Sequence, residues 1–97
     1  MIWKYTAAAV RTDADQLHLR ARQHIRNGVL PRMEPTKTWV GSGSGLLCSL
    51  CDTPILETQI EYEIAFEWME GDTRHRETYL FHESCHRIWR HERDVAA

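Results

Sequence analysis

The most regular pattern in the chain is an alternation of apolar and polar residues between positions 58 and 69. Successive side chains of a β-strand point to opposite faces, so this pattern predicts a strand with one apolar and one acidic face. The apolar positions are Ile60, Tyr62, Ile64, Phe66 and Trp68, and the opposite positions are Glu61, Glu63, Ala65 and Glu67. Turn-forming residues follow at 70–73, and a second alternating segment runs from there to residue 81. Together they predict an antiparallel hairpin, in which Arg74 and Arg76 neutralise the acidic face from the second strand.

A helical spacing of apolar residues precedes the hairpin, over residues 13–27. The apolar positions recur at steps of three and four residues: Ala14, Leu17, Ala21 and Ile25. Thr12 is a suitable N-cap for this helix, and Gly28 is placed to cap its C-terminus. The opposite face is expected to be solvated or to bind phosphate or acidic groups, and it carries His18, Arg22 and Arg26. Residues 1–11 leave a short strand, a docked arm and a helix open.

A second helix is predicted over residues 83–94, directly after the hairpin. Cys85, Ile88 and Trp89 share one stripe of this helix with His82. The side chains expected to face away from that stripe are His86, Arg90 and Arg93. The apolar stripe therefore predicts a helix that packs against the hairpin.

Residues 31–45 are predicted to be a connector without regular structure. Pro31 and Pro35 disfavour helix and strand, and the Gly/Ser run at 41–45 is flexible by composition. A tryptophan in a linker usually packs against a neighbouring element, so we expect Trp39 to dock on the helix or on the segment that follows.

Charge is distributed unevenly, although the formal net charge of the 97 residues is only −2. Residues 1–40 contain seven basic and three acidic side chains, whereas residues 41–97 contain five basic and eleven acidic ones. This asymmetry indicates two surfaces with different partners, or two halves that attract each other. The candidate face for nucleic acid or an acidic partner comprises Arg20, Arg22, Arg26, Arg32 and Lys37.

The chain lacks the sequence features of a membrane or exported protein. No apolar run reaches the length of a membrane span, and the N-terminus lacks the pattern of a signal peptide. An odd number of cysteines, three, argues against a closed disulfide framework and suits metal binding in a reducing compartment. We therefore expect a cytoplasmic protein with no membrane partner.

All three cysteines belong to two short motifs that have the spacing of metal ligands. Cys48 and Cys51 form C-x2-C, and His82 and Cys85 form H-x2-C after thirty intervening residues. Zinc binds four thiolate and imidazole ligands in a tetrahedron, and the predicted hairpin brings the two motifs together. We therefore predict one structural zinc ion held by these four residues, with His86 as an alternative to His82. Three unrelated buried cysteines and a chance histidine are the competing interpretation.

The pattern C-x2-C-x30-H-x2-C, with Trp89 close behind it, is similar to that of treble-clef zinc fingers and resembles the PARP-type finger. The resemblance covers about residues 46–90 and implies a zinc-bound fold. PARP-type fingers recognise DNA breaks through basic and apolar surface, whereas the acidic strand of this chain would repel phosphate. The whole chain also resembles a group of small bacterial proteins in its basic helix, its Leu30-Pro31 turn and its Trp39–Gly45 segment, which implies no particular activity.

The sequence as a whole predicts an α+β fold in two parts. Residues 1–45 form the basic N-terminal helix and a Gly/Ser/Pro connector. Residues 46–97 form a treble-clef-like finger domain made of a zinc knuckle, an antiparallel β-hairpin and a C-terminal helix.

A zinc site filled by four protein ligands leaves no position for water or substrate, which favours a structural role. We therefore expect a non-enzymatic interaction module with an unidentified protein partner, and nucleic-acid binding through the basic helix is the alternative. Catalysis has little support, because the neighbouring Cys85 and His86 diverge on a helix, and the carboxylates of Glu61 and Glu63 lie on an exposed strand.

Overall fold

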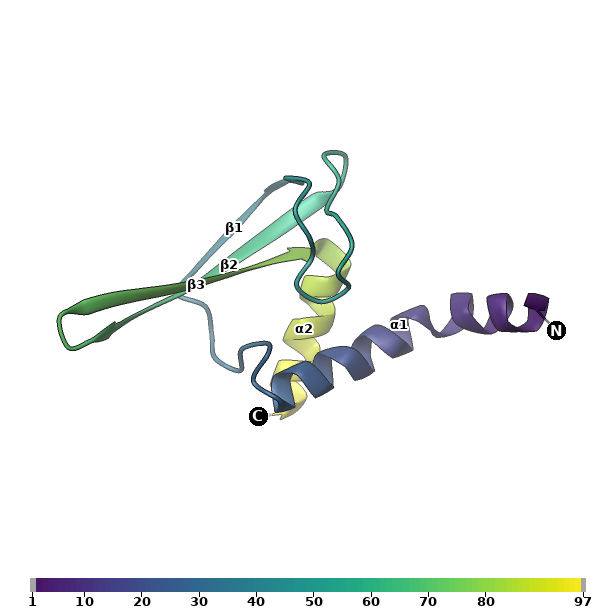
Figure 1. Cartoon of the computed structure of the whole chain (residues 1–97), viewed down its shortest axis with the longest axis horizontal. Helices are drawn as coiled ribbons and strands as arrows, with labels where there is room; N and C mark the ends of the chain where they lie inside the picture. Colours follow the sequence, from purple (N-terminus) through teal and green to yellow (C-terminus); the bar gives the residue numbers. More distant parts are fainter. Residues whose placement is uncertain (1, 97) are drawn as a thin grey trace.

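A computed structural model describes residues 2–96, with side-chain surroundings from residue 14 onward. The elements are α1 (Ile2–Arg26), β1 (Lys37–Ser42), β2 (Ile60–Glu70), β3 (Thr73–His82) and α2 (Glu83–Ala96). The strands form one antiparallel sheet in the order β1-β2-β3. In Figure 1 the sheet lies on one side of α2, and α1 crosses the far end of α2 and extends away from the sheet. The predicted α+β fold class is confirmed.

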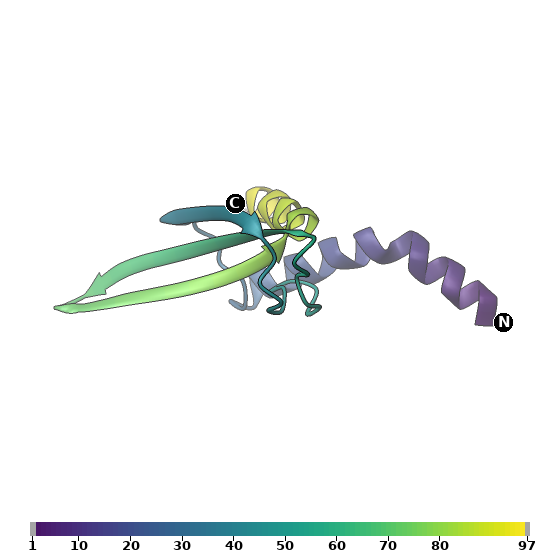
Figure 2. The same cartoon turned by 90° about the horizontal axis from the view of Figure 1, so that it is seen from above.

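The predicted hairpin is present as β2 and β3, joined by a tight turn at Gly71, which has φ +62°. Glycine adopts this left-handed conformation without steric cost. Arg76 lies opposite Glu67 in the register and forms an ion pair with Glu63 at 3.9 Å, as predicted, whereas Arg74 lies opposite Met69. Figure 2 shows the hairpin as a long arm that extends past the end of β1.

The apolar face of the hairpin is covered by α2 toward its open end but not at its tip. Phe81 stacks on Trp89 with ring centroids 5.5 Å apart, and Tyr62 stacks on His86 at 4.2 Å. Phe66 is buried in this core, but Trp68, two positions further along β2, is 42% exposed. The predicted apolar face is therefore a core surface near α2 and a solvent-facing surface at the tip of the hairpin.

The first helix begins at Ile2, so the predicted start at residue 13 is wrong and Thr12 lies inside α1. The alanines at 7–9 are strong helix formers and account for the longer helix. The side chains of Thr12 and of its neighbour at position 13 lie outside the described part of the chain.

The C-terminus of α1 ends as the sequence predicts, with Gly28 at φ +77°. The amide of Val29 donates to the carbonyl of His24 at 2.8 Å, and the amide of Gly28 donates to that of Ile25 at 3.3 Å. This pair of bonds is a Schellman motif, which satisfies carbonyls that the helix itself leaves without partners. The chain then turns back toward α2.

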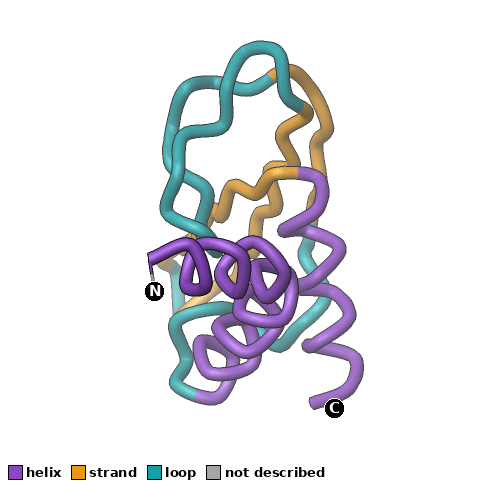
Figure 3. The backbone as a smooth tube through the Cα atoms, turned by 90° about the vertical axis from the view of Figure 1, so that its right-hand side faces the viewer, coloured by secondary structure: helices purple, strands orange, loops and turns teal. Residues whose placement is uncertain are grey.

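A single hydrophobic core contains residues from both sides of position 45. Ala21, Ile25 and Leu30 belong to the same buried cluster as Phe81 and Trp89. The indole Nε1 of Trp89 also donates to the carbonyl of Pro31 at 3.0 Å. Figure 3 shows the two helices side by side against the loops and strands of the remaining chain.

The prediction that His86, Arg90 and Arg93 face away from the core is correct only for Arg90. His86 and Arg93 are buried, because α2 lies between the sheet on one side and the segment after α1 on the other. The guanidinium of Arg93 lies 4.9 Å from the ring centroid of Trp89 and donates to Glu34 at 2.7 Å.

The predicted flexible connector contains a strand, β1, so the prediction for residues 31–45 is wrong in this part. Lys37 pairs with Ala65, and Ser42 pairs with Ile60. Trp39 lies in β1 itself and is 43% exposed, with the guanidinium of Arg76 5.4 Å from its ring centroid. A six-residue strand with a glycine near its end has little alternation of its own, and its pairing with β2 decides its conformation.

The Gly/Ser run continues β1 as an ordered segment. The amide of Gly43 donates to the carbonyl of Gln59 at 2.9 Å, and the amide of Gly45 donates to that of Ile55 at 2.9 Å. Ser44 donates to Oε1 of Glu61 twice, from its amide at 3.0 Å and from its hydroxyl at 2.6 Å. These hydrogen bonds hold the run against the residues that lead into β2.

Candidate metal centre

The first pair of cysteines lies on a tight turn between residues 46 and 55. The amide of Cys48 donates to the carbonyl of Thr53 at 2.9 Å, and the amide of Asp52 donates to that of Cys48 at 3.0 Å. Asp52 has φ +61°, a left-handed conformation that aspartate tolerates better than most residues. The turn reverses the chain within four residues and points the sulfurs of Cys48 and Cys51 in the same direction, as a C-x2-C motif requires.

The second pair of candidate ligands stands at the junction between β3 and α2. His82 is the last residue of β3, and Cys85 lies in the first turn of α2. Their three-residue spacing across this junction brings both side chains toward the cysteine turn. The hairpin therefore returns the chain to its starting point, as the sequence predicts.

The side chains of Cys48, Cys51, His82 and Cys85 converge. Their four donor atoms all lie within 4.8 Å of one another, and Sγ of Cys51 is 3.3 Å from Nδ1 of His82. Two ligand atoms on a tetrahedral zinc ion are about 3.3–3.8 Å apart for ordinary Zn–N and Zn–S bonds. Cys48 and Cys85 are buried, Cys51 and His82 are half-buried, and all three cysteines are free of disulfides. The donor set and its spacing therefore fit a metal ion such as zinc.

The other nitrogen of His82 fixes which atom is available to a metal. Nε2 lies 3.1 Å from the carbonyl oxygen of Pro54, which accepts hydrogen bonds and cannot donate them. Nε2 therefore carries the proton in the neutral imidazole, and the lone pair of Nδ1 faces the cysteine sulfurs. Metal-binding histidines commonly have such a second hydrogen bond, which orients the ring.

The surroundings of Cys48 favour the thiolate form of its side chain. A hydrogen bond from the thiol of Cys85, opposed by burial and aided by nearby backbone N–H groups, lowers the pKa of Cys48 to about 4. The hydrogen bond to Cys48 and burial raise the pKa of Cys85. Cys48 and Cys85 thus share one proton. When thiolates bind a metal cation, the cation takes the place of such a proton.

Further contacts hold the cysteine turn in place. The amide of Ser49 donates to the carbonyl of Leu80 at 2.6 Å, and the amide of Leu80 donates to Oγ of Ser49 at 3.1 Å. Arg20 on α1 forms an ion pair with Asp52. The turn is therefore fixed both to the strand that carries His82 and to the first helix.

His86, the alternative ligand, is directed into the core instead. Its ring is stacked on Tyr62 and lies 6.1 Å from the ring centroid of Phe81. Burial, with the positive charges of Arg90 and Arg93, lowers the pKa of His86 to about 4. The structure therefore brings His82, and not His86, to the cysteines.

The five basic residues predicted to form one face are divided between separate contacts. Arg20 pairs with Asp52, Arg22 with Glu92 at 3.0 Å, and Lys37 on β1 with Glu67 at 3.7 Å. Arg26 and Arg32 line an open hollow of about 290 Å³ beside the C-terminus of α2, together with Arg22 and Glu92. The structure therefore does not gather the five residues into a continuous basic face.

The helix face predicted to be solvated is exposed at Arg22 and Arg26, but His18 is half-buried against α2. His18 Nδ1 lies 2.7 Å from Oε2 of Glu92, and Arg22 donates to the other oxygen of the same carboxylate. His91 completes a group of three potential metal ligands with His18 and Glu92. His18 and Glu92 are 74 residues apart in the chain, so no local spacing pattern predicts this contact.

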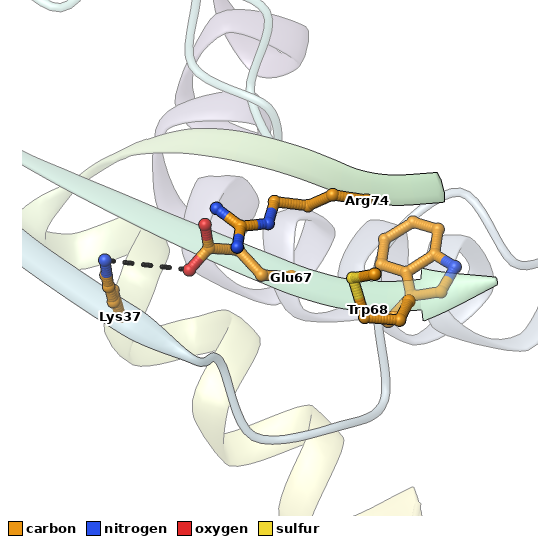
Figure 4. Close-up of a pocket in the computed structure, with 5 residues that line it drawn as sticks. Lys37, Glu67, Trp68 and Arg74 are labelled. Atoms are coloured by element: carbon orange, nitrogen blue, oxygen red, sulfur yellow. Dashed lines mark ion pairs between the residues drawn. The ribbon is translucent and has the colours of Figure 1, made fainter. Parts of the chain in front are cut away.

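Another hollow, of about 370 Å³, lies on the sheet near the tip of the hairpin. Figure 4 shows residues from all three strands around it, with Lys37 paired to Glu67 and with Trp68 and Arg74 further toward the tip. Trp68 stacks on His75 with ring centroids 5.2 Å apart, and Met69 is largely exposed. This surface joins apolar side chains with the guanidinium of Arg74, since the charge of Lys37 is paired with that of Glu67.

The chain was compared with protein-family models, with curated proteins and with solved structures, and none of them matched. Among the helices described between residues 2 and 96, neither combines the length and the apolar composition needed to cross a lipid bilayer.

Proposed function

We propose that this protein is a non-enzymatic zinc-binding interaction module, in which one structural zinc ion holds a small platform for a protein partner. The observation that carries the proposal is the convergence of Cys48, Cys51, His82 and Cys85. Three sulfurs and one imidazole complete a tetrahedron, so the proposed ion has no open position for water or substrate. A catalytic zinc needs such a position, and a structural zinc does not.

The order of elements supports the further proposal of a treble-clef-like finger with PARP-type spacing. A cysteine turn, a β-hairpin and a helix follow one another, and the ligands come from the turn and from the start of the helix. Three features go beyond this plan, namely α1, β1 and the ordered Gly/Ser segment.

The tip of the hairpin is the proposed contact surface for the protein partner. Glu63 pairs with Arg76 and Glu67 pairs with Lys37, while Glu61 accepts hydrogen bonds from Ser44, so the carboxylates of the acidic face already have partners within the molecule. At the tip, Trp68 and Met69 remain exposed beside the positive charge of Arg74. A partner segment with an apolar side chain next to a carboxylate is complementary to this surface.

Metal analysis of full-length protein purified without chelators tests the metal part of the proposal. At least one zinc ion per chain is expected, and removal of the cysteine-bound ion with a chelator should unfold the protein, because structural zinc contributes about 10–16 kcal/mol in small fingers. The net stability of a domain is only about 5–15 kcal/mol. A well-folded, metal-free protein with three reactive thiols would refute the metal site.

Binding experiments test the partner. Proteins that are retained by wild type and lost with Trp68→Ala, at equal zinc content, support the hairpin tip, and Thr58→Ala serves as an exposed control away from it. Salt-sensitive binding of nucleic acid that is lost with Arg26→Ala and Arg32→Ala would favour the alternative function instead.

A further inference from the structure

The crossing of the two helices contains a group of potential metal ligands that is distinct from the cysteine cluster. His18 on α1 and His91 and Glu92 on α2 each place one donor atom within 4.8 Å of the other two. His18 Nδ1 lies 2.7 Å from Oε2 of Glu92. The rings of His18 and His91 meet edge to face, with centroids 5.5 Å apart.

Glu92 is held in a position and a charge state that suit a metal ligand. Its side chain is only 4% exposed, and Arg22 Nε donates to Oε1 at 3.0 Å, which leaves Oε2 directed to His18. Burial opposes ionisation of this carboxyl, but the hydrogen bonds from Arg22 and His18 outweigh it and lower its pKa. The carboxylate is therefore anionic and oriented before any cation arrives, as the second contact of a metal-binding carboxylate usually ensures.

We propose that His18, His91 and Glu92 form a second metal site, for a divalent transition metal ion such as zinc. Two imidazoles and one carboxylate are an established donor set for zinc, and they leave a fourth position for water. This site differs from the cysteine cluster in having three protein ligands and no sulfur.

Only a small rearrangement is needed for the ion to bind. Nitrogen and oxygen ligands on a tetrahedral zinc ion are about 3.3 Å apart, so His18 and Glu92 must separate from their present hydrogen-bond distance. The side chain of His18 is 33% exposed and His91 is exposed, so both rings have room to turn. Any proton that His18 shares with Glu92 passes to water as the cation takes its place.

An ion-pair network that merely joins the helices explains part of the same geometry, and His91 separates the two explanations. Hydrogen bonds connect His18 to Glu92 and Glu92 to Arg22, and both remain when His91 is replaced. A structural network therefore leaves His91 dispensable, whereas a three-ligand site requires it.

The test uses full-length, untagged protein that is freed of metal and titrated with cobalt(II), the first equivalent of which is expected to refold the chain at the cysteine cluster. Wild type is expected to bind two equivalents, of which the tighter gives thiolate-to-cobalt charge transfer and the second does not. His91→Gln and His18→Gln should each lose the second equivalent and keep the charge-transfer band. His75→Gln, a substitution of another partly exposed histidine outside the cluster, should bind two equivalents.

Each outcome supports or overturns the second site. A single equivalent in wild type that gives the charge-transfer band, or a second equivalent that persists in His91→Gln, would leave only an ion-pair network. The charge-transfer band reports the cysteine cluster independently, so its absence together with one histidine-dependent equivalent would refute the proposed zinc finger and retain the second site.

Discussion

His82 and His86 are only four residues apart, yet one is a candidate metal ligand and the other belongs to the core. His82 ends β3 with Nδ1 directed to the sulfur of Cys51, while His86 lies in α2 and stacks on Tyr62. The difference arises because the cysteine turn and the sheet contact different parts of this segment. Sequence spacing alone allows either histidine to bind the metal, and the surroundings of each ring decide between them.

Substitution of each histidine by alanine should therefore give different results. His82→Ala removes one of four proposed ligands and is expected to weaken zinc binding strongly. His86→Ala should retain the cysteine-bound zinc but lose about 1–3 kcal/mol of stability, because it leaves a gap beside Tyr62. Metal analysis and denaturant unfolding of both variants measure these effects, and loss of zinc only in His86→Ala would reverse the assignment.

The buried carboxylate of Glu92 should make stability depend on pH. Its pKa is lowered in the folded protein, so its contribution is present above the ordinary glutamate value of about 4.5 and is lost as the pH falls through the lower folded value. Glu92→Gln should cost about 1–3 kcal/mol at pH 7, since the amide cannot replace a charged acceptor for two donors. The difference from wild type should shrink below pH 4.5.

Unfolding of wild type and Glu92→Gln at matched pH values checks this expectation. Loss of zinc from the cysteine cluster in acid affects both proteins alike, and no metal is added that could fill the second site, so the difference between them isolates Glu92. A stability difference that grows as the pH falls would contradict a lowered pKa for this carboxyl.

Among the elements, the segment from β1 to the cysteine turn differs most from the structure that its composition predicts. Gly43 passes so close to the backbone that an added Cβ would overlap the carbonyl oxygen of Leu56. Ser44 and Gly45 are hydrogen-bonded to residues around the start of β2. A run that has the composition of a linker is thus packed because its residues are small enough to approach other backbone.

Gly43→Ala and Gly41→Ala form a matched pair that tests this packing. The alanine at position 43 collides with backbone and should destabilise the protein by at least about 1–3 kcal/mol. The alanine at position 41 meets no atom within 4 Å and should be nearly neutral. Thermal unfolding of both variants decides the matter, and equal midpoints would show that the run is a plain linker.

The accuracy of sequence-based prediction differs among the elements for a physical reason. The hairpin and α2 have long periodic patterns, and the cysteine and histidine spacing predicts the convergence of the four side chains. β1 has no such pattern, because its conformation depends on pairing with β2, which lies far along the chain. The contact between His18 and Glu92 also depends on the crossing of two helices, which neither helix encodes alone.

For the whole molecule, the shared core links the N-terminal helix to the candidate metal centre. Ile25 and Leu30 are buried with Trp89, and Cys85 belongs to the same cluster. Arg20 adds a direct contact from α1 to Asp52 in the cysteine turn. The division of the chain at position 45 into two parts stays a prediction, and these contacts provide a way to test it.

Ile25→Ala should disturb the metal centre as well as the helix. Truncation of a buried isoleucine lowers the free energy of unfolding by about 2–5 kcal/mol. We expect faster loss of zinc to a chelator, because Ile25 belongs to the same buried cluster as Cys85. Leu19→Ala, at an exposed position on the same helix, is the control and should change neither quantity. Unchanged zinc release in a destabilised Ile25→Ala would indicate that the two parts of the chain behave independently.

The two hydrogen bonds between Ser49 and Leu80 protect two backbone amides from exchange with solvent for as long as the cysteine turn stays on β3. They join the cysteine turn to β3 two residues before His82, so their amide protons become accessible to solvent only when the turn leaves the strand. In heavy water these two amides should exchange slowly while metal is bound and quickly after chelation. Because removal of the metal is expected to unfold the protein, the amides at the tip of the hairpin should also exchange faster after chelation.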